Sequence, residues 1–583
     1  MQMGRLELQV GTRHLDQGLL RAIVLVGLAL LLPMTSAART VYLPIVVKAP
    51  PYWPNPLEHR IAARAVAGDG QFYDRATGLR FVPRGATYTR LGPIQTPDGV
   101  ITYHTTFQAG TYDAARAETA LRQMAQYGYN TVQVEVHGCA DRCVADPATG
   151  ALSGPYLDNV ADFIRRARSN NLFVMLRTDD LPHGSSYSNY LFVDHWRADI
   201  ASVNAQFLTA EGIEANRRYY RDLIQALIAR GAPLSNIVGY AIRGEAYMDP
   251  TIPPFTTASG FLTAANGQTY DLGNAQDVAR MVDDAFVYFV DQIRAAILAV
   301  DPSALVGIGF FAPQTPHPWR VGDTRLTATR GLVTRSTADF VDFHPYPGEE
   351  LTLAQFMENY GVDRRPARVL MMSEFGAYKR TYGSAARAAQ ANADWQSESC
   401  QYGYDGWLWW TWDTVEQDPP LWAAIEDNGT VAQALSPRTR PDPCAPSSAP
   451  PNIALKGPVT ASGTALPGNP PAAAVDGLST TWWTGGPTPQ WIEVDLGADT
   501  RVARVALLIS QTPAGYTLHR VRGRTQAGAW RSLHEFAGVT ADSQTLEVTL
   551  AQPWPEVRYI RIESVESPSW VGWRELEVFP PPS

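Results

Sequence analysis

Short apolar runs alternate with longer segments of helical periodicity along most of the chain between residues 81 and 410. In one helical segment the apolar side chains recur at intervals of three and four residues, which places one stripe against a sheet: Tyr220, Leu223, Ile224, Leu227 and Ile228. A second segment, 275–300, is stopped by Asp301 and Pro302. The strand-like runs lie at 81–87, 130–136, 172–178, 236–242, 304–310, 339–343, 369–373 and 406–410.

Eight strand-like runs, most of them separated by helical segments, predict an α/β fold, a TIM-type (β/α)8 barrel, over residues 61–440. A doubly wound open sheet is the alternative, but no glycine-rich phosphate loop follows the first run. Barrels of this type carry their chemistry at the carboxyl ends of the strands. The residues that end the runs are therefore the candidates for function.

Two of the runs end on a glutamate. The uncharged run 369–372 leads into Ser373 and Glu374, and the run that begins at residue 236 presents Glu245 just beyond its end. This pattern is typical of buried parallel strands that deliver carboxylates to a cleft. Two carboxylates at equivalent strand ends can cleave a glycosidic bond. The alternative is a pair of strand-end carboxylates held in ion pairs without a catalytic role.

A retaining glycoside hydrolase needs one ionised and one protonated carboxyl group, roughly 5 to 5.5 Å apart. Glu374 is the expected nucleophile, because His344 and Tyr346 on the neighbouring strand can hydrogen-bond its charged form. Glu245 is the expected acid/base, because apolar and aromatic residues near it in the sequence favour its protonated form: Tyr240, Ile242 and Tyr247.

Further substrate contacts are expected from other strand ends. His137 and Asp179 could supply polar contacts, or they could be loop or capping residues. Trp410 and Trp412 end the eighth run, and alternation along a strand sends some of these indoles into the core. Either Trp410 or Trp412 could form the stacking surface for a sugar ring.

The C-terminal part of the chain has another architecture. Residues 441–451, PDPCAPSSAPP, cannot form a packed element and mark a linker. From residue 452 to 580 the helical periodicity disappears, and short alternating strands are separated by Gly, Pro and Asp turns. This pattern predicts an antiparallel β-sandwich of about 130 residues.

The N-terminal residues 1–38 have the pattern of an export signal. Arg21 precedes the apolar run 22–32, Pro33 breaks it, and the small residues 36–38 offer a cleavage site. The run is too short to span a bilayer, although an uncleaved anchor is the alternative. A Pro-rich linker is expected over 39–60. The mature protein is therefore expected to be secreted or associated with the cell surface, without a transmembrane segment.

The four cysteines fit two disulfides, because the number is even and an exported chain meets an oxidising compartment. Their proximity in the sequence pairs Cys139 with Cys143 and leaves Cys400 with Cys444. A metal site at CADRC is the weaker alternative, because no His pair lies close.

Charge and composition indicate which classes of partner the protein can bind. The formal net charge of -9 is spread without blocks, which indicates neither a nucleic-acid surface nor an anionic-membrane patch. The 16 Trp residues suit stacking on sugar faces, although many will be core. We expect a glycan partner, no nucleic acid and a monomer.

The barrel segment resembles the clan A glycoside hydrolases, most closely glycoside hydrolase family 5 and its relatives, over roughly residues 65–441. The resemblance rests on FYDRATGLRFVPRGATY, NIVGYAIRGEAY, DFHPYPG, RVLMMSEFGAY and WLWWTWDT. It implies that Glu245 is the general acid/base and Glu374 the nucleophile, with no cofactor for catalysis. It also places the family's His-x-Tyr at His344 and Tyr346, and its Trp at Trp410 or Trp412.

Three positions depart from the family's pattern. The Asn that normally precedes the acid/base is Gly244, the Arg usual on the second strand is replaced by Gln133, and the third-strand His by Thr178 or Asp179. In the family these groups orient a carboxylate or the 2-hydroxyl of the sugar. The departures favour an alternative, a non-catalytic carbohydrate-binding lectin or adhesin built on a hydrolase barrel.

The C-terminal segment resembles the factor V/VIII type C, or discoidin, domain, including carbohydrate-binding module family 32. The matching stretches are NIALKGPVTASG, AAAVDGLSTTWWTG, WIEVDLG and SWVGWRELEVF. Members of that family often hold a structural ion. Carried over by position, the ligands would be Asp476, the carbonyl of Leu478, Thr481 and Glu575, which suit Ca²⁺. A loop closed by hydrogen bonds without metal is the alternative.

Together these patterns predict a secreted retaining glycoside hydrolase that acts on a β-linked polysaccharide or oligosaccharide and carries a carbohydrate-binding module. A barrel acting on an ester or amide is less favoured, because no Ser or Cys nucleophile motif with a His partner is present.

Overall fold

The computed structural model describes residues 53–581, except 97–98, 137–143, 147, 312–324, 349–350, 363–365, 418–419, 446–451 and 478–480. Several predicted features lie outside the described residues: the signal segment 1–38, most of 39–60, His137, Cys139, Cys143 and Leu478.

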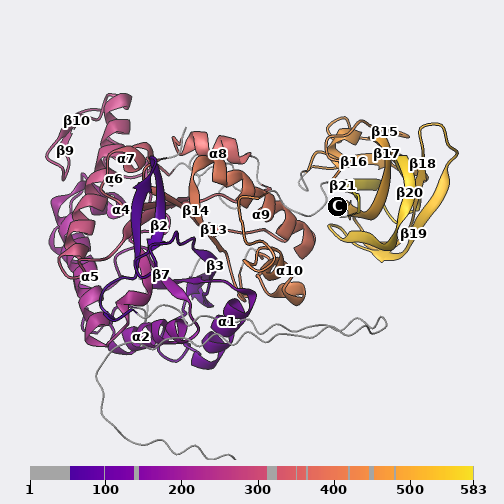
Figure 1. Cartoon of the computed structure of the whole chain (residues 1–583). Helices are drawn as coiled ribbons and strands as arrows, with labels where there is room; N and C mark the ends of the chain where they lie inside the picture. The colour runs from indigo at the N-terminus through magenta and orange to yellow at the C-terminus, as the bar shows by residue number, and fades with distance from the viewer. Residues whose placement is uncertain are drawn as a thin grey trace, which may run out of the picture. The chain divides into compact units, whose positions relative to one another are not determined.

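Eight parallel strands close into a barrel in the order β3-β6-β7-β8-β11-β12-β13-β14 (Figure 1). The predicted TIM-type fold is thereby confirmed, and each strand-like run of the sequence supplies one strand. Their bounds are β3 (Arg84–Thr87), β6 (Thr131–Val136), β7 (Phe173–Thr178), β8 (Ile237–Ala241), β11 (Val306–Phe311), β12 (Phe340–His344), β13 (Val369–Phe375) and β14 (Tyr404–Trp409).

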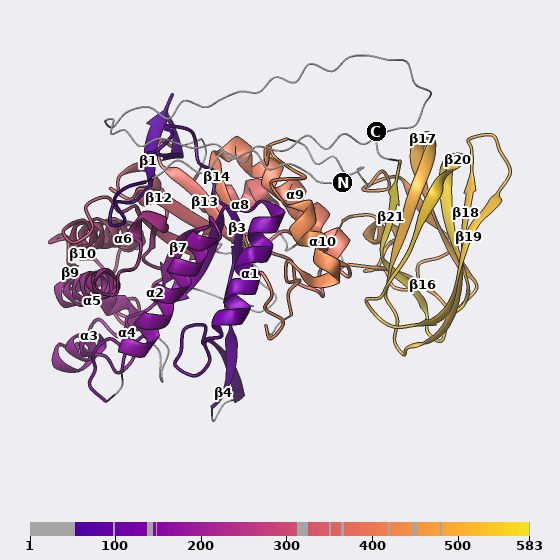
Figure 2. The same cartoon turned by 60° about the horizontal axis from the view of Figure 1, so that its bottom comes forward.

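Helices surround the barrel strands in both views (Figures 1 and 2). They are α1 (Ala114–Tyr127), α2 (Gly154–Ser169), α3 (Ser186–Asn189), α4 (Ser202–Leu208), α5 (Ala210–Ala229), α6 (Ala275–Leu298), α7 (Arg330–Thr334), α8 (Leu353–Asn359), α9 (Ala385–Ser399) and α10 (Glu426–Ala434). Shorter helical segments of the barrel are η1 (Tyr190–Asp194), η2 (Leu234–Asn236) and η3 (Cys400–Tyr402), whereas η4 (Pro471–Ala474) belongs to the C-terminal part.

Local sequence explains where the two longest helices begin. Thr209 caps α5 by accepting a hydrogen bond from the backbone of Gly212, and Asn274 caps α6 in the same way. The predicted apolar stripe of α5 is buried in the core, except for Ile228, which is half-buried. The helix α6 ends shortly before Asp301, as its sequence predicts.

Two hairpins lie at opposite ends of the barrel (Figure 2). The hairpin β1 (Ile61–Val66) and β2 (Asp69–Asp74) packs Ile61 and Phe72 against residues near the strand starts. The hairpin β4 (Leu91–Thr96) and β5 (Gly99–His104) follows β3 at the carboxyl end. A third hairpin, β9 (Phe261–Thr263) and β10 (Thr269–Asp271), precedes α6.

Residues 53–60, which we assigned to the Pro-rich linker, pack against the barrel. The fully buried His59 contacts the carbonyl of Ile237 at 2.9 Å and Asp301 Oδ2 at 2.7 Å. The hydroxyl of Tyr240 donates to the same Asp301 oxygen at 2.9 Å. This buried polar cluster, His59, Asp301 and Tyr240, therefore joins the N-terminal segment to the starts of the barrel strands.

The disulfide between Cys400 and Cys444 is confirmed, with the two Cα atoms 5.6 Å apart. It links the end of α9 to the segment that follows α10. The tail of the barrel is thus covalently attached to its outer helices.

The C-terminal part is an antiparallel β-sandwich, as predicted. Its strand order is β16-β21-β17-β20-β18-β19, with β15 paired to β17. The core contains Trp483, Ile492, Leu507, Ile562 and Trp573, all with at most 2% of their surface exposed. The strands are β15 (Val459–Ala461), β16 (Trp483–Gly486), β17 (Gln490–Ile509), β18 (Gly515–Arg524), β19 (Arg531–Thr540), β20 (Thr545–Glu566) and β21 (Val571–Phe579).

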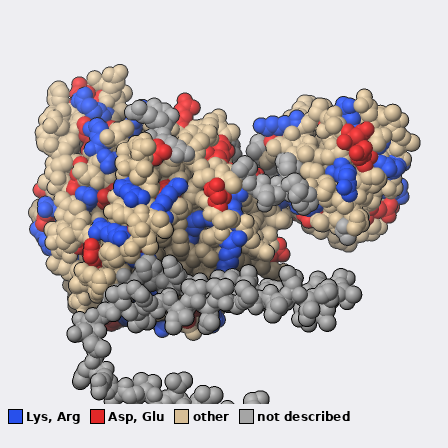
Figure 3. Space-filling model, viewed as in Figure 1, with Lys and Arg blue, Asp and Glu red and all other residues tan. Residues whose placement is uncertain are grey.

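Basic and acidic side chains are interspersed over the visible face of the barrel (Figure 3). That face carries no extended area of one charge, as the even charge pattern of the sequence predicts. Among the described residues, no helix has both the length and the apolar character needed to cross a bilayer.

Candidate active site

The carboxyl ends of four neighbouring strands bring the two predicted glutamates together. Glu374 is the second-last residue of β13, and Glu245 lies four residues beyond the last residue of β8. One carboxylate oxygen of each lies within 4.8 Å of the other and of a ring nitrogen of His344. Residues far apart in the sequence thus form one cluster.

Three donors surround the carboxylate of Glu374, which is 8% exposed. The hydroxyl of Tyr346 donates to Oε1 at 2.8 Å, and Arg177 Nη1 donates to Oε2 at 2.5 Å. His344 Nδ1 lies 3.4 Å from Oε2. These contacts fix the orientation of the carboxylate.

Glu245 has a different environment. Its side chain is 21% exposed, and Oε1 lies 3.3 Å from His344 Nδ1. Tyr247 lines the same cavity as Glu245, but Tyr240 does not belong to this environment, because its hydroxyl binds Asp301 in the buried polar cluster. The grouping of Tyr240 with Glu245 from the sequence was therefore wrong, because Tyr240 lies within β8 whereas Glu245 lies beyond its end.

His344 is fixed between the two glutamates. Its Nε2 lies 3.1 Å from Asp342 Oδ2, and Asp342 Oδ1 in turn accepts from the backbone of Ser373 at 2.7 Å. Burial alone would lower the pKa of His344, but the carboxylates of Glu374 and Asp342 raise it to about 10. At neutral pH His344 is therefore an imidazolium that donates from both nitrogens.

The titration of His344 predicts a pH-dependent stability. A group whose pKa is raised from about 6.5 in the unfolded chain stabilises the fold below that pH, and this stabilisation is lost as the pH rises toward about 10. The thermal unfolding midpoint of the wild type should therefore fall between pH 6.5 and 10 more steeply than that of His344→Asn. Exposed His183→Asn is the control. Parallel midpoint curves for wild type and His344→Asn would contradict this prediction.

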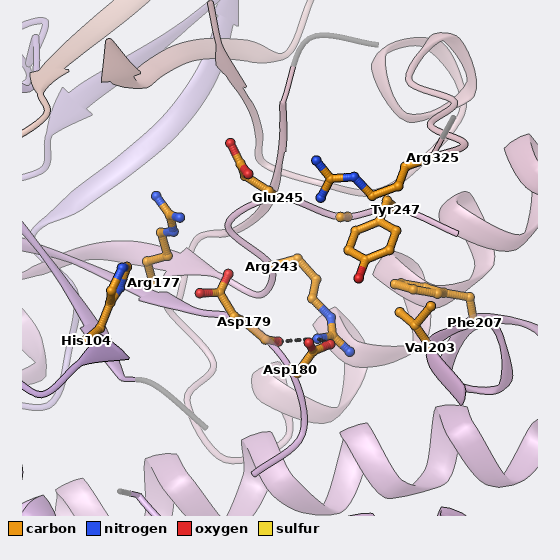
Figure 4. A pocket seen from close by; sticks show the side chains of 11 residues that line it. His104, Arg177, Asp179, Asp180, Val203, Phe207, Arg243, Glu245, Tyr247 and Arg325 are labelled. Carbon is orange, nitrogen blue, oxygen red and sulfur yellow. Dashed lines mark hydrogen bonds and ion pairs between the residues drawn. The ribbon is translucent and has the colours of Figure 1, made fainter. Parts of the chain in front are cut away.

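A cavity of about 290 Å³ lies beside Glu245 (Figure 4). Its wall is mostly polar and combines residues from β5, β7, α4 and the segment after β8. The lining residues are His104, Arg177, Asp179, Asp180, Val203, Phe207, Arg243, Glu245, Ala246, Tyr247 and Arg325.

Asp179 lines this cavity and also stabilises the loop that carries Glu245. Its Oδ1 accepts from the backbone N–H of Gly244 at 3.0 Å, and its carbonyl accepts from Arg243. Arg243 also donates to Asp180 at 2.5 Å. The position of Asp179 is thus compatible with both interpretations of the sequence, substrate contact and loop support.

The two candidate tryptophans occupy different places. Trp412 is fully buried and packs edge-on against Tyr129 with ring centroids 5.9 Å apart, so it belongs to the core. Trp410 is 5% exposed and lies 5.6 Å from the ring of His104, with the guanidinium of Arg177 over its face. Of the two alternatives, only Trp410 borders the candidate site.

Three residues of the site were not predicted from the sequence: Arg177, Glu135 and His104. Glu135 on β6 is in register with Arg177 on β7, and the two form an ion pair at 3.1 Å. His104 contacts the other oxygen of Glu135. Two opposite charges inside consecutive apolar strands were a usable signal, because such charges are rarely buried unless they are paired.

Gln133 does not take the place of the family's arginine. Its side-chain amide donates to the hydroxyl of Thr87 and to the carbonyl of Ser373, both at 3.1 Å. It is fully buried and supports the strand that carries Glu374. The positive charge beside Glu374 comes from Arg177 on the next strand instead.

Glu245, His344 and Glu374 could also ligate a cation, since their ligand atoms lie within 4.8 Å of one another. A metal would require neutral His344, whereas the surrounding carboxylates favour its protonated form. The imidazolium and Arg177 already compensate the charge of the two glutamates.

The sandwich brings three of the four predicted calcium ligands into one region. Thr481 donates its hydroxyl to Asp476 Oδ2 at 2.8 Å. Glu575 is fully buried, and neither of its carboxylate oxygens receives a hydrogen bond from the described residues. Burial, together with the carboxyl groups of Glu577 and Asp476, raises the pKa of Glu575 well above its usual range. Hard oxygen atoms without donors fit a cation such as Ca²⁺.

A known domain family matches the C-terminal sandwich. The sequence model of the F5/8 type C domain matches residues 458–576. The C-terminal sandwich is an F5/8 type C domain. The discoidin resemblance of the sequence is thereby confirmed, and the match covers the strands β15 to β20 and most of β21.

Solved structures similar to the F5/8 type C domain include chitosan-binding module 1 of a chitosanase/glucanase from Paenibacillus sp. IK-5. It is 26% identical over 22% of this chain and 98% of that chain, with a TM-score of 0.20. The family 32 CBM of C. perfringens NanJ, solved with galactose, is 20% identical over 21% of this chain and 93% of that chain, also with a TM-score of 0.20.

The barrel is similar to the exo-β-1,4-mannosidase Op5Man5 from Opitutaceae bacterium strain TAV5. The identity is 18%, over 64% of this chain and 63% of that chain, with a TM-score of 0.40. The chain thus spans less than two thirds of the mannosidase. No curated protein sequence matches the chain.

Proposed function

We propose that the barrel is a retaining glycoside hydrolase acting on a β-linked polysaccharide or oligosaccharide, and that the F5/8 type C domain binds a glycan. The observation that carries this proposal is the approach of the Glu245 and Glu374 carboxylate oxygens to within 4.8 Å. Retaining enzymes need carboxyl groups about 5 to 5.5 Å apart, whereas inverting enzymes need about 6.5 to 9.5 Å. The β-linkage rests on the resemblance of the barrel to family 5.

In the first step of the proposed reaction, Glu374 Oε attacks the anomeric carbon and the glycosidic C–O bond breaks. The proton of Glu245 passes to the leaving oxygen, so the leaving group departs as an alcohol. Water then attacks the glycosyl ester, gives its proton to Glu245 and releases Glu374 as a carboxylate. The Tyr346, His344 and Arg177 donors favour the ionised Glu374 that starts and ends this cycle.

Export and tethering belong to the same proposal. The segment 1–38 has the pattern of a signal peptide, and the Cys400–Cys444 disulfide suits an oxidising compartment. A glycan-binding domain attached to the barrel raises the local concentration of substrate near Glu245 and Glu374. Sugar binding by the F5/8 type C domain is inferred mainly from the attached barrel.

We further propose that Asp476, Thr481 and Glu575 hold a structural Ca²⁺ in the F5/8 type C domain. Added Ca²⁺ should raise the unfolding midpoint of the full chain's sandwich transition by about 5 °C or more at saturation, because a ligand stabilises the state that binds it. Scanning calorimetry with Ca²⁺ and with a chelator measures this shift. Glu575→Gln should abolish the shift and exposed Glu566→Gln should retain it. Equal midpoints of the wild type in both conditions would contradict calcium binding.

The hydrolase proposal is tested with the secreted full chain on a panel of β-linked polysaccharides and aryl glycosides. Release of sugar by the wild type, with retention of configuration in the first product, is the expected result. Binding without hydrolysis of any panel member would instead favour the lectin alternative.

A further inference from the structure

Arg177 holds a central place among the charges of the barrel mouth. Its side chain is 5% exposed and forms ion pairs with Glu374 at 2.5 Å and with Glu135 at 3.1 Å. Glu135 is 1% exposed and is also contacted by His104. The guanidinium is thus fixed from behind by a buried carboxylate and faces the predicted nucleophile in front.

The guanidinium of Arg177 fills the space that a side chain at residue 244 would need. A Cβ atom added to Gly244 would lie 2.5 Å from Arg177 Nη2 and closer still to Nε and Cζ. Contacts this short do not occur, so any side chain at residue 244 would displace the guanidinium. The backbone of Gly244 has no positive φ, so glycine is required here for space and not for conformation.

One edge of the guanidinium remains available to a ligand. Nη1 is bound to Glu374, and Nε faces Glu135. Within the described part of the chain no acceptor is bound to Nη2, and Arg177 lines the cavity beside Glu245. A hydroxyl group next to the reacting carbon would lie near this edge, because Arg177 binds the carboxylate that would attack that carbon and lines the cavity beside Glu245.

We propose that Arg177 positions Glu374 and donates a hydrogen bond to the substrate hydroxyl adjacent to the anomeric carbon, and that Gly244 is required to admit its guanidinium. This inference rests on the proposed function of the barrel. It assigns to a residue pair on β7 and after β8 the substrate-orienting role that the sequence departures at residues 133, 178 and 244 left unassigned. A side chain at residue 244 and the seated Arg177 exclude one another.

A double-mutant cycle tests the exclusion. Gly244→Ala should lower kcat/KM by about 10² to 10³-fold, as expected for the loss of one donor at a reacting centre. Arg177→Lys keeps a positive charge opposite the buried Glu135, which protects folding. Lysine lacks the planar guanidinium, however, and so cannot bind Glu374, Glu135 and a substrate hydroxyl with separate N–H groups. In the Arg177→Lys background Gly244→Ala should cost less than about 3-fold, because its target is gone.

Gly154→Ala is the matched control, since its added Cβ meets only an ordinary contact at 3.5 Å. It should leave kcat/KM at the wild-type value. Full additivity of the losses caused by Gly244→Ala and Arg177→Lys, or a wild-type kcat/KM in Gly244→Ala, would overturn the exclusion.

A second cycle tests the contact with substrate, using an aryl glycoside that the wild type hydrolyses and its 2-deoxy analogue. Arg177→Lys should lower kcat/KM about 10 to 100-fold more for the parent than for the analogue, the range expected for a charged hydrogen bond. Equal losses for both substrates would overturn this role of Arg177 while leaving the hydrolase intact.

The role of Arg177 and Gly244 can also be tested by binding if the wild type hydrolyses none of the sugars. If the wild type binds a panel oligosaccharide by calorimetry but hydrolyses none, the proposed hydrolase fails, and the same variants are compared by their Kd. Weaker binding of the parent sugar by Gly244→Ala and Arg177→Lys would then support the inference. Unchanged Kd values, or no binding and no hydrolysis by the wild type, would overturn it.

Discussion

Glu374→Gln should lower kcat by on the order of 10⁴-fold or more, because the amide cannot form the glycosyl ester. Glutamine keeps the shape of the side chain and can still accept from Tyr346. Binding of the substrate should therefore survive while its cleavage stops. Hydrolysis of the panel, followed in parallel with calorimetric binding of one oligosaccharide, measures both.

The control for this variant is Glu358→Gln, an exposed glutamate on α8 that should leave kcat unchanged. Circular dichroism and the unfolding midpoint establish that Glu374→Gln is folded. Turnover of Glu374→Gln at the wild-type rate would remove Glu374 from the mechanism.

Glu245→Gln should show a loss that depends on the leaving group. For leaving groups that need a proton, such as a second sugar, kcat/KM should fall by about 10² to 10⁴-fold. For an activated aryl leaving group, kcat/KM should stay near the wild-type value, since its departure needs no proton. A series of aryl glycosides with graded leaving-group acidity provides the measurement.

A second, independent result is expected for Glu245→Gln. Without Glu245 as base, water attacks the glycosyl ester slowly, so the ester should accumulate with the activated substrates and give a burst of the aryl alcohol. Azide, which needs no base, should then speed turnover. An equal loss for every leaving group, with no burst, would contradict an acid/base role of Glu245.

Much of the barrel could be predicted because its signals are local. Each strand is a short apolar run, and Glu245 and Glu374 lie where such runs end, so that parallel strands bring both to one edge. The disulfide of Cys400 and Cys444 followed from pairing by proximity. None of these features needs the register of one strand against another.

The features that were missed depend on register. Glu135 and Arg177 meet only because the second and third barrel strands align them. The need for glycine at residue 244 is visible only once Arg177 is placed beside it. The same limit affects aromatic residues: Trp410 and Trp412 are two residues apart, yet one borders the site and the other fills the core. A departure from a family pattern can therefore be a rearrangement of contacts, which the isolated sequence presents as a loss.

The buried polar cluster of His59, Asp301 and Tyr240 lies where the barrel strands begin, whereas Glu245 and Glu374 lie where strands end. Substitutions in this cluster should therefore change the stability of the folded protein without changing its turnover number. A protein loosened at His59 should start each assay at full speed and then lose activity with time, so its progress curves would bend although its initial rates match the wild type. Conversely, stabilising substitutions for industrial use could be collected around His59 without altering the reaction rate.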